Sequence, residues 1–141
     1  MADNDVKIEY HTEELMEALE FKKEKALVMV GTQAEGYAKI EIESDPRRVD
    51  TGRLRNSITW ATLKEHSDVE GTSGNEDASP SDGLDTSQGE ENAVVIGTNV
   101  EYAVEIHEGR KGLDPNRFLR NAVEKHSDEY RQIIDDVMKE E

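Results

Sequence analysis

The sequence predicts an α+β domain: a small antiparallel sheet flanked by a long N-terminal helix and a C-terminal helix, with a long acidic hairpin tip. Two observations predict the layers. Apolar residues recur at helical spacing over residues 12–42 and again over 114–139, and two stretches rich in β-branched residues lie between them. The chain has 141 residues, of which 34% are hydrophobic. This length and composition predict one domain over residues 1–141 with a modest core.

The first helix follows a short alternating stretch, Val6–His11, which is predicted to be a strand. Thr12 is a good N-terminal cap, and apolar residues then recur at steps of three, four and seven, which marks one buried helix face. We expect this helix to continue to about Ile42, or to break near Gly31 or Gly36.

Two strands and an acidic connection come next. Ser57–Glu65 is rich in Thr, Ile and Trp, and Asn92–Thr98 contains a continuous β-branched run, so both are predicted strands and the second is predicted to be buried. Between them, His66–Glu91 contains eight carboxylates and no Lys or Arg. Its apolar surface is too small to offset the entropy of ordering it, which predicts an extended loop reaching about 40 Å from the domain. We expect this loop to be an arm that grips a neighbouring protein.

The last third of the chain is predicted to be mainly helical. Residues 99–109 fit either a short helix or a strand, and the helix is favoured. Asp114 is then predicted to cap a final helix with Pro115 at its first position, and an apolar face continues to about Lys139. His126 lies on this apolar face and is interpreted as a core or interface histidine.

The charge of the chain limits its partners. Lys and Arg number 17 and Asp and Glu number 33, which gives a formal net charge of −16. Because affinity for nucleic acid comes mainly from cations that neutralise phosphates, an ordinary DNA- or RNA-binding role is disfavoured. The alternatives are a solvated surface suited to high salt, a surface that nucleic acid passes without binding, a mimic of nucleic acid, or plain solubility.

The expected cellular location of the protein is inferred from two features that the sequence lacks. No apolar stretch approaches the roughly 20 residues that a membrane span requires, and the acidic first residues show no signal-peptide pattern. We therefore expect no membrane contact and synthesis in the cytoplasm.

Patterns that carry chemistry are not found in the sequence. The four histidines show no metal-ligand spacing, the chain has no cysteine, and neither GxSxG nor a phosphate-binding GxxxxGK[ST] occurs. The stretch DASPSDGLD lacks the spacing of a calcium loop. The sequence therefore predicts no catalytic residue, no cofactor and no metal site, and the chain is not expected to be an enzyme.

The stretch VDTGRLRNSI, Val49–Ile58, is predicted to join the long helix to the sheet. Asp50 or Thr51 is expected to cap a short helical turn. Leu54 and Ile58 are four residues apart, so both are expected to point inward.

Arg53 and Asn56 are then expected to point away from these two side chains, so arginine is available on the outer side of this joint. In so acidic a chain, Arg53 and Arg55 are expected to pair with carboxylates in preference to phosphate, and the carboxylates of another copy are candidates. The alternative is two solvated arginines on a turn.

Three stretches in this order resemble the tail-completion family of long-tailed phages, also called head–tail joining or minor tail proteins. They are VDTGRLRNSI, VVIGTNVEYAVEIHEG (Val94–Gly109) and RFLRNAVEKH (Arg117–His126), and the resemblance covers about Ala26–Lys139 except the acidic segment. It implies a small α+β domain that assembles as a ring, commonly of six copies, in the virion neck between the head connector and the tail tube. It implies a structural role without a reaction, with genomic DNA passing through the lumen without specific binding.

The partners implied by this resemblance are other copies of the chain, the head-completion or connector protein and the tail tube protein. The residues expected at the assembly interface are Asp50, Thr51, Arg53, Arg55, Tyr102, Arg117 and Phe118. The competing hypothesis is a free acidic protein that mimics nucleic acid and inhibits a basic nucleic-acid enzyme.

A net charge of −16 predicts that salt stabilises the folded protein. Self-repulsion acts over the Debye length, which shrinks from about 10 Å at 0.1 M salt to about 3 Å at 1 M. We expect the melting temperature to rise between these concentrations in differential scanning calorimetry. Chloride is the anion to use, because sulfate strengthens apolar burial by itself. A flat or falling melting temperature would contradict the prediction.

Overall fold

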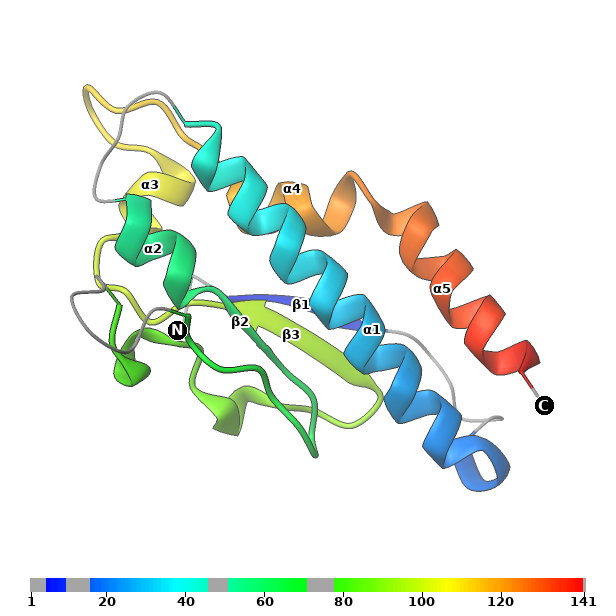
Figure 1. Ribbon diagram of the computed structural model, residues 1–141. Helices are drawn as coiled ribbons and strands as arrows, with labels where there is room; N and C mark the ends of the chain where they lie inside the picture. Colours follow the sequence, from blue (N-terminus) through cyan, green and yellow to red (C-terminus); the bar gives the residue numbers. More distant parts are fainter. Residues whose placement is uncertain (1–4, 10–15, 46–50, 71–77, 141) are drawn as a thin grey trace.

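The computed structural model describes residues 5–9, 16–45, 51–70 and 78–140 (Figure 1). Its strands are β1 (Asp5–Glu9), β2 (Thr59–Ala61) and β3 (Ala93–Gly97). Its helices are α1 (Met16–Glu43), α2 (Thr51–Ser57), α3 (Ala103–Glu108), α4 (Phe118–Glu124) and α5 (Ser127–Lys139), with the short 3₁₀ helices η2 (Pro80–Asp82) and η3 (Thr86–Gln88). The predicted α+β class, with a small antiparallel sheet and long helices at both ends of the chain, is confirmed.

The sheet has the order β1-β3-β2, and both pairs of strands are antiparallel. The central strand β3 is buried at all five positions, as its continuous β-branched sequence predicts. Val94 and Ile96 face α1, whereas Val95 faces the other side of the sheet and packs with Ala61 and Leu84.

Strand β2 is much shorter than the predicted strand Ser57–Glu65. Ser57 is the last residue of α2. At the other end, Thr62 Oγ1 accepts the N–H groups of Lys64 (3.2 Å) and Glu65 (2.9 Å), which closes a turn instead of extending the strand. The β-propensity of this stretch is thus overridden by a local side-chain bond.

Helix α1 is continuous past both glycines, so the predicted alternative of a break is wrong. Gly31 lies where the helix touches the sheet: a Cβ there would be 2.7 Å from Val94 Cγ2 and 2.9 Å from Trp60 Cγ. A Cβ at Gly36 would have no atom within 4 Å. The predicted cap, Thr12, lies outside the described residues.

A single large apolar cluster joins α1 to every later helix. Leu54 and Ile58 are fully buried in it, as predicted for the joint. The buried members of the cluster are Leu27, Val30, Ala34, Ala38, Ile42, Leu54, Ile58, Trp60, Val94, Ile96, Val100, Ala103, Ile106, Phe118, Leu119, Ala122 and Tyr130.

The C-terminal helical region begins later than predicted. Asp114 and Pro115 lie in a loop, and α4 begins at Phe118. The backbone N–H of Asn116 donates to the carbonyl of Ile106 (2.8 Å), so this loop is bonded back to α3 and does not form a first helical turn.

This helical region is also divided in two. His126 has φ −123° and ψ 19°, which separates α4 from α5, and its ring stacks on Tyr37 of α1 with centroids 3.5 Å apart. Asp128 and Glu129 in the first turn of α5 suit a new helix N-terminus. The break redirects the chain so that α5 runs back along α1 (Figure 1), with Tyr130 and Val137 buried. His126 is therefore a half-buried junction residue and does not lie in the middle of a helix face.

The acidic segment does not project as an extended arm in the parts that are described. Leu84 is 6% exposed and covers the face of the sheet opposite α1, where it meets Ala61 and Val95. Gly89 allows the segment to approach the backbone of the β2 turn, because a Cβ would lie 2.2 Å from the Thr62 carbonyl oxygen. Figure 1 shows residues 78–91 beneath the sheet as a second layer. The predicted reach of about 40 Å is thus wrong for these residues, because an isolated leucine anchors an otherwise polar segment.

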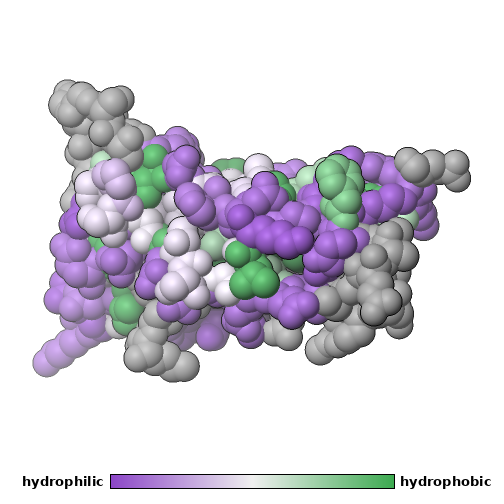
Figure 2. Space-filling model, turned by 90° about the horizontal axis from the view of Figure 1, so that it is seen from below, coloured by the Kyte–Doolittle hydropathy of each residue, from purple (hydrophilic) through white to green (hydrophobic). Residues whose placement is uncertain are grey.

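The surface is mainly polar. The face seen in Figure 2 is mostly hydrophilic and is interrupted by separate hydrophobic patches. Most of the ion pairs on the described surface join partly exposed side chains, such as Lys7 with Glu90 at 3.1 Å and Lys25 with Glu140 at 2.6 Å. Such exposed pairs contribute little stability each, so the core cluster carries most of it.

The two glycines of α1 provide a matched test of the packing. Gly31→Ala should lower the free energy of unfolding by about 1–3 kcal/mol, because the new methyl group overpacks the contact with β2 and β3. Gly36→Ala should raise it by about 0.5–1 kcal/mol, because alanine restricts the unfolded chain and meets no atom in the fold. Urea unfolding measures both changes, and equal signs for the two variants would contradict the packing described.

Candidate functional site

Helix α2 presents its arginines on the side opposite its apolar contacts. The guanidinium of Arg53 binds two carboxylates at once. Its Nε and Nη2 donate to Asp82 (3.1 and 2.8 Å), and its Nη1 and Nη2 donate to Glu101 (2.9 and 3.0 Å). These contacts join α2 to η2 and to the turn between β3 and α3. We call this group, Arg53, Asp82 and Glu101, the arginine junction.

Asp82 is the buried member of the arginine junction, with 6% of the residue exposed. The Arg53 guanidinium holds the pKa of the Asp82 carboxyl below its usual value, and the backbone N–H of Ser79, 3.0 Å away, acts in the same direction. The Asp82 carbonyl accepts the N–H of Asn99 at 2.7 Å. Both the side chain and the backbone of Asp82 therefore fix the acidic segment to the domain.

Glu101 and Tyr102 complete the surroundings of Arg53. The Arg53 guanidinium also lowers the pKa of Glu101, which is exposed. The guanidinium carbon lies 5.7 Å from the centre of the Tyr102 ring, a cation–π distance. Arg53 is thus surrounded by groups that favour its charge, and its pKa is raised.

Two buried hydroxyls lie behind the arginine junction. Ser57 Oγ donates to the Leu54 carbonyl (2.6 Å) and lies 2.6 Å from Thr98 Oγ1. Thr98 Oγ1 accepts the N–H of Val100 at 3.1 Å. The Asp82 carbonyl oxygen also lies 3.4 Å from Thr98 Oγ1, so the single proton of Thr98 is shared between Ser57 and Asp82. These hydroxyls join the end of α2 and the end of β3 to the acidic segment.

Arg55 belongs to a second and more exposed network. Its Nε lies 3.3 Å from Glu43 and its Nη1 lies 3.3 Å from Glu70. Glu70 also pairs with the buried Lys39, whose ammonium group lowers the pKa of Glu70 and lies 2.9 Å from Glu35. This network attaches the beginning of the acidic segment to α1.

The carboxylates that bind both arginines belong to the same chain. The sequence left open whether another copy supplies them, and the described contacts of Arg53 and Arg55 are intramolecular. Their sequence-predicted place in an assembly interface stays a prediction.

The other predicted interface residues are scattered. Asp50 lies outside the described residues, and Thr51 begins α2. Tyr102 is half-buried beside Arg53, and Arg117 is exposed with its Nε 3.8 Å from Glu108. Phe118 is fully buried, so its expected role at an interface is wrong. It is a core residue because α4 turns its first apolar side chain toward α3.

Phe118 contacts the one buried histidine of the described chain, His107, edge to face. His107 Nδ1 bonds to the Glu108 carboxylate and Nε2 accepts the backbone N–H of Arg120 at 3.2 Å. Burial lowers the pKa of His107, with Glu108 opposing the shift. Nε2 joins α3 to α4, whereas Nδ1 bonds within α3, so both ring nitrogens have partners and this histidine is structural.

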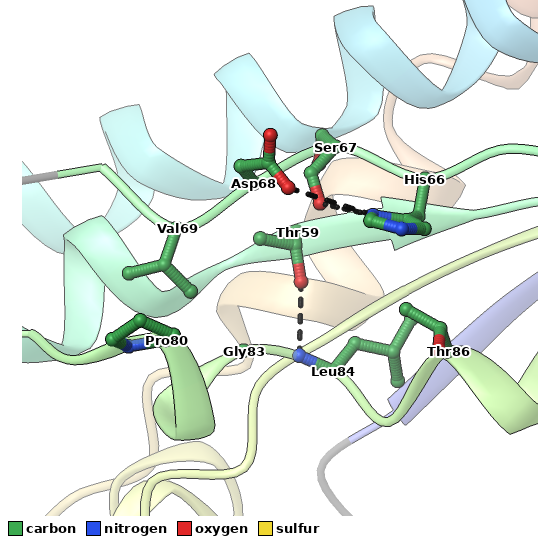
Figure 3. A pocket seen from close by; sticks show the side chains of 9 residues that line it. All are labelled: Thr59, His66, Ser67, Asp68, Val69, Pro80, Gly83, Leu84 and Thr86. Atoms are coloured by element: carbon green, nitrogen blue, oxygen red, sulfur yellow. Dashed lines mark hydrogen bonds and ion pairs between the residues drawn. The ribbon is translucent and has the colours of Figure 1, made fainter. Parts of the chain in front are cut away.

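A hollow of about 310 Å³ lies between the two ends of the acidic segment (Figure 3). Thr59 of β2 forms its floor, where Thr59 Oγ1 accepts the N–H of Leu84 at 2.9 Å. The full lining is Thr59, His66, Ser67, Asp68, Val69, Pro80, Gly83, Leu84 and Thr86.

His66, Ser67 and Asp68 in this hollow have the residue types of a hydrolytic triad without its geometry. Ser67 Oγ accepts the N–H of Trp60 (2.9 Å) and donates to Glu35 (2.6 Å), so its proton does not go to His66. His66 Nδ1 lies 3.6 Å from Asp68, and both side chains are at least half exposed. Activation of a serine requires a hydrogen bond to its base, which this arrangement does not provide.

Neither a metal-binding group nor a membrane span is found where the structure is described. Within those ranges, no three His, Asp or Glu side chains are placed to hold a metal ion. None of the described helices combines the length and apolar character needed to cross a bilayer.

Asp82 and Glu101 were not singled out by sequence reasoning. Asp82 is one of eight carboxylates in its segment, and spacing alone cannot say which of them a distant arginine selects. One signal was present: Asp82 lies two residues before Leu84, one of the few apolar residues between 66 and 91. A lone leucine in a polar segment indicates a point of attachment.

Comparisons with protein-family models, with curated proteins and with solved structures found no match. The functional argument therefore depends on the residues of this chain.

A double-mutant cycle tests the arginine junction. Arg53→Met and Asp82→Asn should each lower the free energy of unfolding, and the double variant should lose less than the sum, with a coupling energy of about 1–3 kcal/mol. Arg53→Lys should keep only part of the coupling, because a single ammonium cannot bind two carboxylates in the same geometry. Arg55→Met is the matched control, since its exposed pairs are expected to contribute less than about 1 kcal/mol. Additive effects of the Arg53 and Asp82 changes in urea unfolding would exclude the coupling.

Proposed function

We propose that this chain is a structural protein of a virion neck, a tail-completion protein whose copies form a ring between the head connector and the tail tube. In this proposal the ring is a hexamer, genomic DNA passes through its lumen without specific binding, and the chain carries out no reaction.

One observation carries the proposal. The three stretches on which the resemblance to tail-completion proteins is based contribute to the same apolar cluster. Leu54 and Ile58 come from the first stretch, Val100, Ala103 and Ile106 from the second, and Phe118, Leu119 and Ala122 from the third. Stretches that are far apart in sequence and meet in one core specify a domain, so their combination is a stronger indication of family than any one of them.

The arrangement of charge is compatible with this role. Arg53 and Arg55, which could have bound phosphate, are paired with carboxylates of their own chain. The net charge of −16 repels phosphate, so DNA passing such a ring would not be retained by electrostatic attraction.

The catalytic alternative has little support among the described residues. The hollow of Figure 3 holds a serine whose hydroxyl is bonded to Glu35 and the Trp60 N–H. His107 has both ring nitrogens bonded, one to Glu108 and one to the backbone of α4. These side chains serve the fold.

Immunoelectron microscopy of phage particles that carry an epitope tag on this chain tests the proposal. We expect gold-labelled antibody at the junction of head and tail, because the ring is proposed to remain in the neck. Label elsewhere on the particle would contradict the proposal. Recovery of the tagged chain only outside particles, bound to a nucleic-acid enzyme that it inhibits, would favour the acidic mimic.

A further inference from the structure

The outward side of α1 differs in character from the rest of the surface. The described chain has four exposed large hydrophobic residues: Phe21 (82%), Leu63 (61%), Ile40 (55%) and Met29 (40%). Phe21, Met29 and Ile40 lie on α1 at separations of 8 and 11 residues, which places them within a sector of about 100° around the helix. They therefore share the side of the helix that faces away from the sheet.

Between Phe21 and Ile40, this side of α1 carries no carboxylate of its own; Glu43 follows one turn later, and Lys25 binds Glu140 at 2.6 Å. We call this side the outer stripe and define it as Phe21, Lys25, Met29, Thr32, Gly36 and Ile40. It extends for about 28 Å, at 1.5 Å per residue. In a chain with 33 Asp and Glu residues, this is an uncommon stretch of surface.

The carboxylates nearest to the outer stripe are turned toward other groups. Glu24 accepts a hydrogen bond from Thr62 Oγ1 at 2.7 Å, and Glu35 accepts from Lys39 at 2.9 Å. Both are only partly exposed. The stripe is therefore bordered by negative charge without containing it.

One end of the outer stripe is hollowed. Phe21, Val28 and Met29 line an open depression of about 320 Å³ together with Glu24, Lys25 and Glu65. Leu63 lies on the adjoining turn and lines a neighbouring depression with Leu27. All four exposed hydrophobic residues thus belong to α1 or to the turn that leans on it.

We propose that the outer stripe is the surface through which one copy of this chain contacts a second copy. The inference rests on the proposed ring and names the face that closes it. Two copies with a charge of −16 each repel one another, and the repulsion is least where no carboxylate enters the contact. Apolar side chains at that place supply the attraction. In a closed ring, the stripe of one copy meets a different surface of the next.

Other occupants fit the stripe less well. The carboxylates that would attract a basic partner lie beside the stripe, at Glu24 and Glu65, and Glu24 already accepts a hydrogen bond from Thr62. Helices that lie on membranes have polar flanks rich in Lys and Arg, whereas Glu20, Glu24 and Glu35 flank this stripe. Nucleic acid is repelled by the net charge.

The size of the stripe predicts a weak contact outside the ring. A surface about 28 Å long and about 10 Å wide is well below the roughly 800 Å² per partner of a stable interface. Copies should therefore associate only transiently in dilute solution, and ring closure adds the further contacts.

Photo-crosslinking of the full chain tests this proposal. Because the chain has no cysteine, benzophenone maleimide attached to Thr32→Cys labels the centre of the stripe alone. The matched control is Ser87→Cys, an exposed position on η3 at the opposite side of the sheet. We expect irradiation to link chains from position 32 and not from position 87. Adding Phe21→Ser and Ile40→Ser should reduce the linked product at least about tenfold, as expected for loss of two large apolar side chains.

The salt dependence of crosslinking distinguishes a contact between two like-charged copies from a contact that depends on attraction between opposite charges. Linking from position 32 should increase between 0.1 M and 1 M chloride, because salt screens repulsion between like-charged copies. Two results would overturn the proposal. One is crosslinking from position 32 that is no stronger than crosslinking from position 87 at both salt concentrations. The other is crosslinking from position 32 that does not decrease when Phe21→Ser and Ile40→Ser are added. The neck location is tested separately by microscopy, so labelled necks without this crosslink would refute the interface alone. If the protein crosslinks from position 32 but microscopy does not find it in necks, the proposed neck ring would be wrong and the contact between copies would still be supported.

Discussion

The attachment of the acidic segment to this domain depends on the pairing of one arginine with two carboxylates. Arg53 fixes Asp82, and Asp82 fixes a segment that carries eight acidic residues and no basic one. A carboxylate that is 6% exposed is costly to bury without a counter-charge, so Asp82 can occupy its position only because the guanidinium is there. Leu84, two residues on, then covers the open face of the sheet. The Arg53–Asp82 ion pair and the apolar contact of Leu84 together hold the acidic segment against the sheet as a layer of the domain.

The elements predicted most accurately from the sequence are those specified by local periodicity. The α1 helix and the buried strand β3 follow from apolar spacing and from a β-branched run, and the short helix α3 was preferred over a strand for the same reason. The acidic segment was predicted wrongly because its average composition hides Leu84, and because the choice of Asp82 by Arg53 is a contact across 29 residues. The two-part C-terminal helix was missed because apolar spacing continues through the break at His126, where stacking on Tyr37 stabilises a non-helical backbone.

The candidate site was predicted in part for a similar reason. The position of the joint and the inward direction of Leu54 and Ile58 follow from helical geometry, which the sequence encodes locally. The partners of Arg53 come from η2 and from the turn after β3, and only the tertiary fold brings them to α2. Phe118 was placed at an interface by resemblance, whereas its burial follows from how α4 packs on α3. The stretches on which the resemblance is based thus contain many residues that hold the core together.

The charge pattern connects stability to assembly. Much of the acid near the joint is neutralised within the chain: Asp82 and Glu101 by Arg53, Glu70 by Lys39 and Arg55. What remains is a negative surface that keeps copies apart and repels phosphate. An attractive contact between copies must then be apolar and local, and α1 presents apolar side chains along a face that lacks carboxylates. Because that face is too small to hold two copies by itself, association in the proposed ring depends on every copy making its contacts at once. On this proposal, the copies stay apart until their neighbours in the proposed particle bring them together.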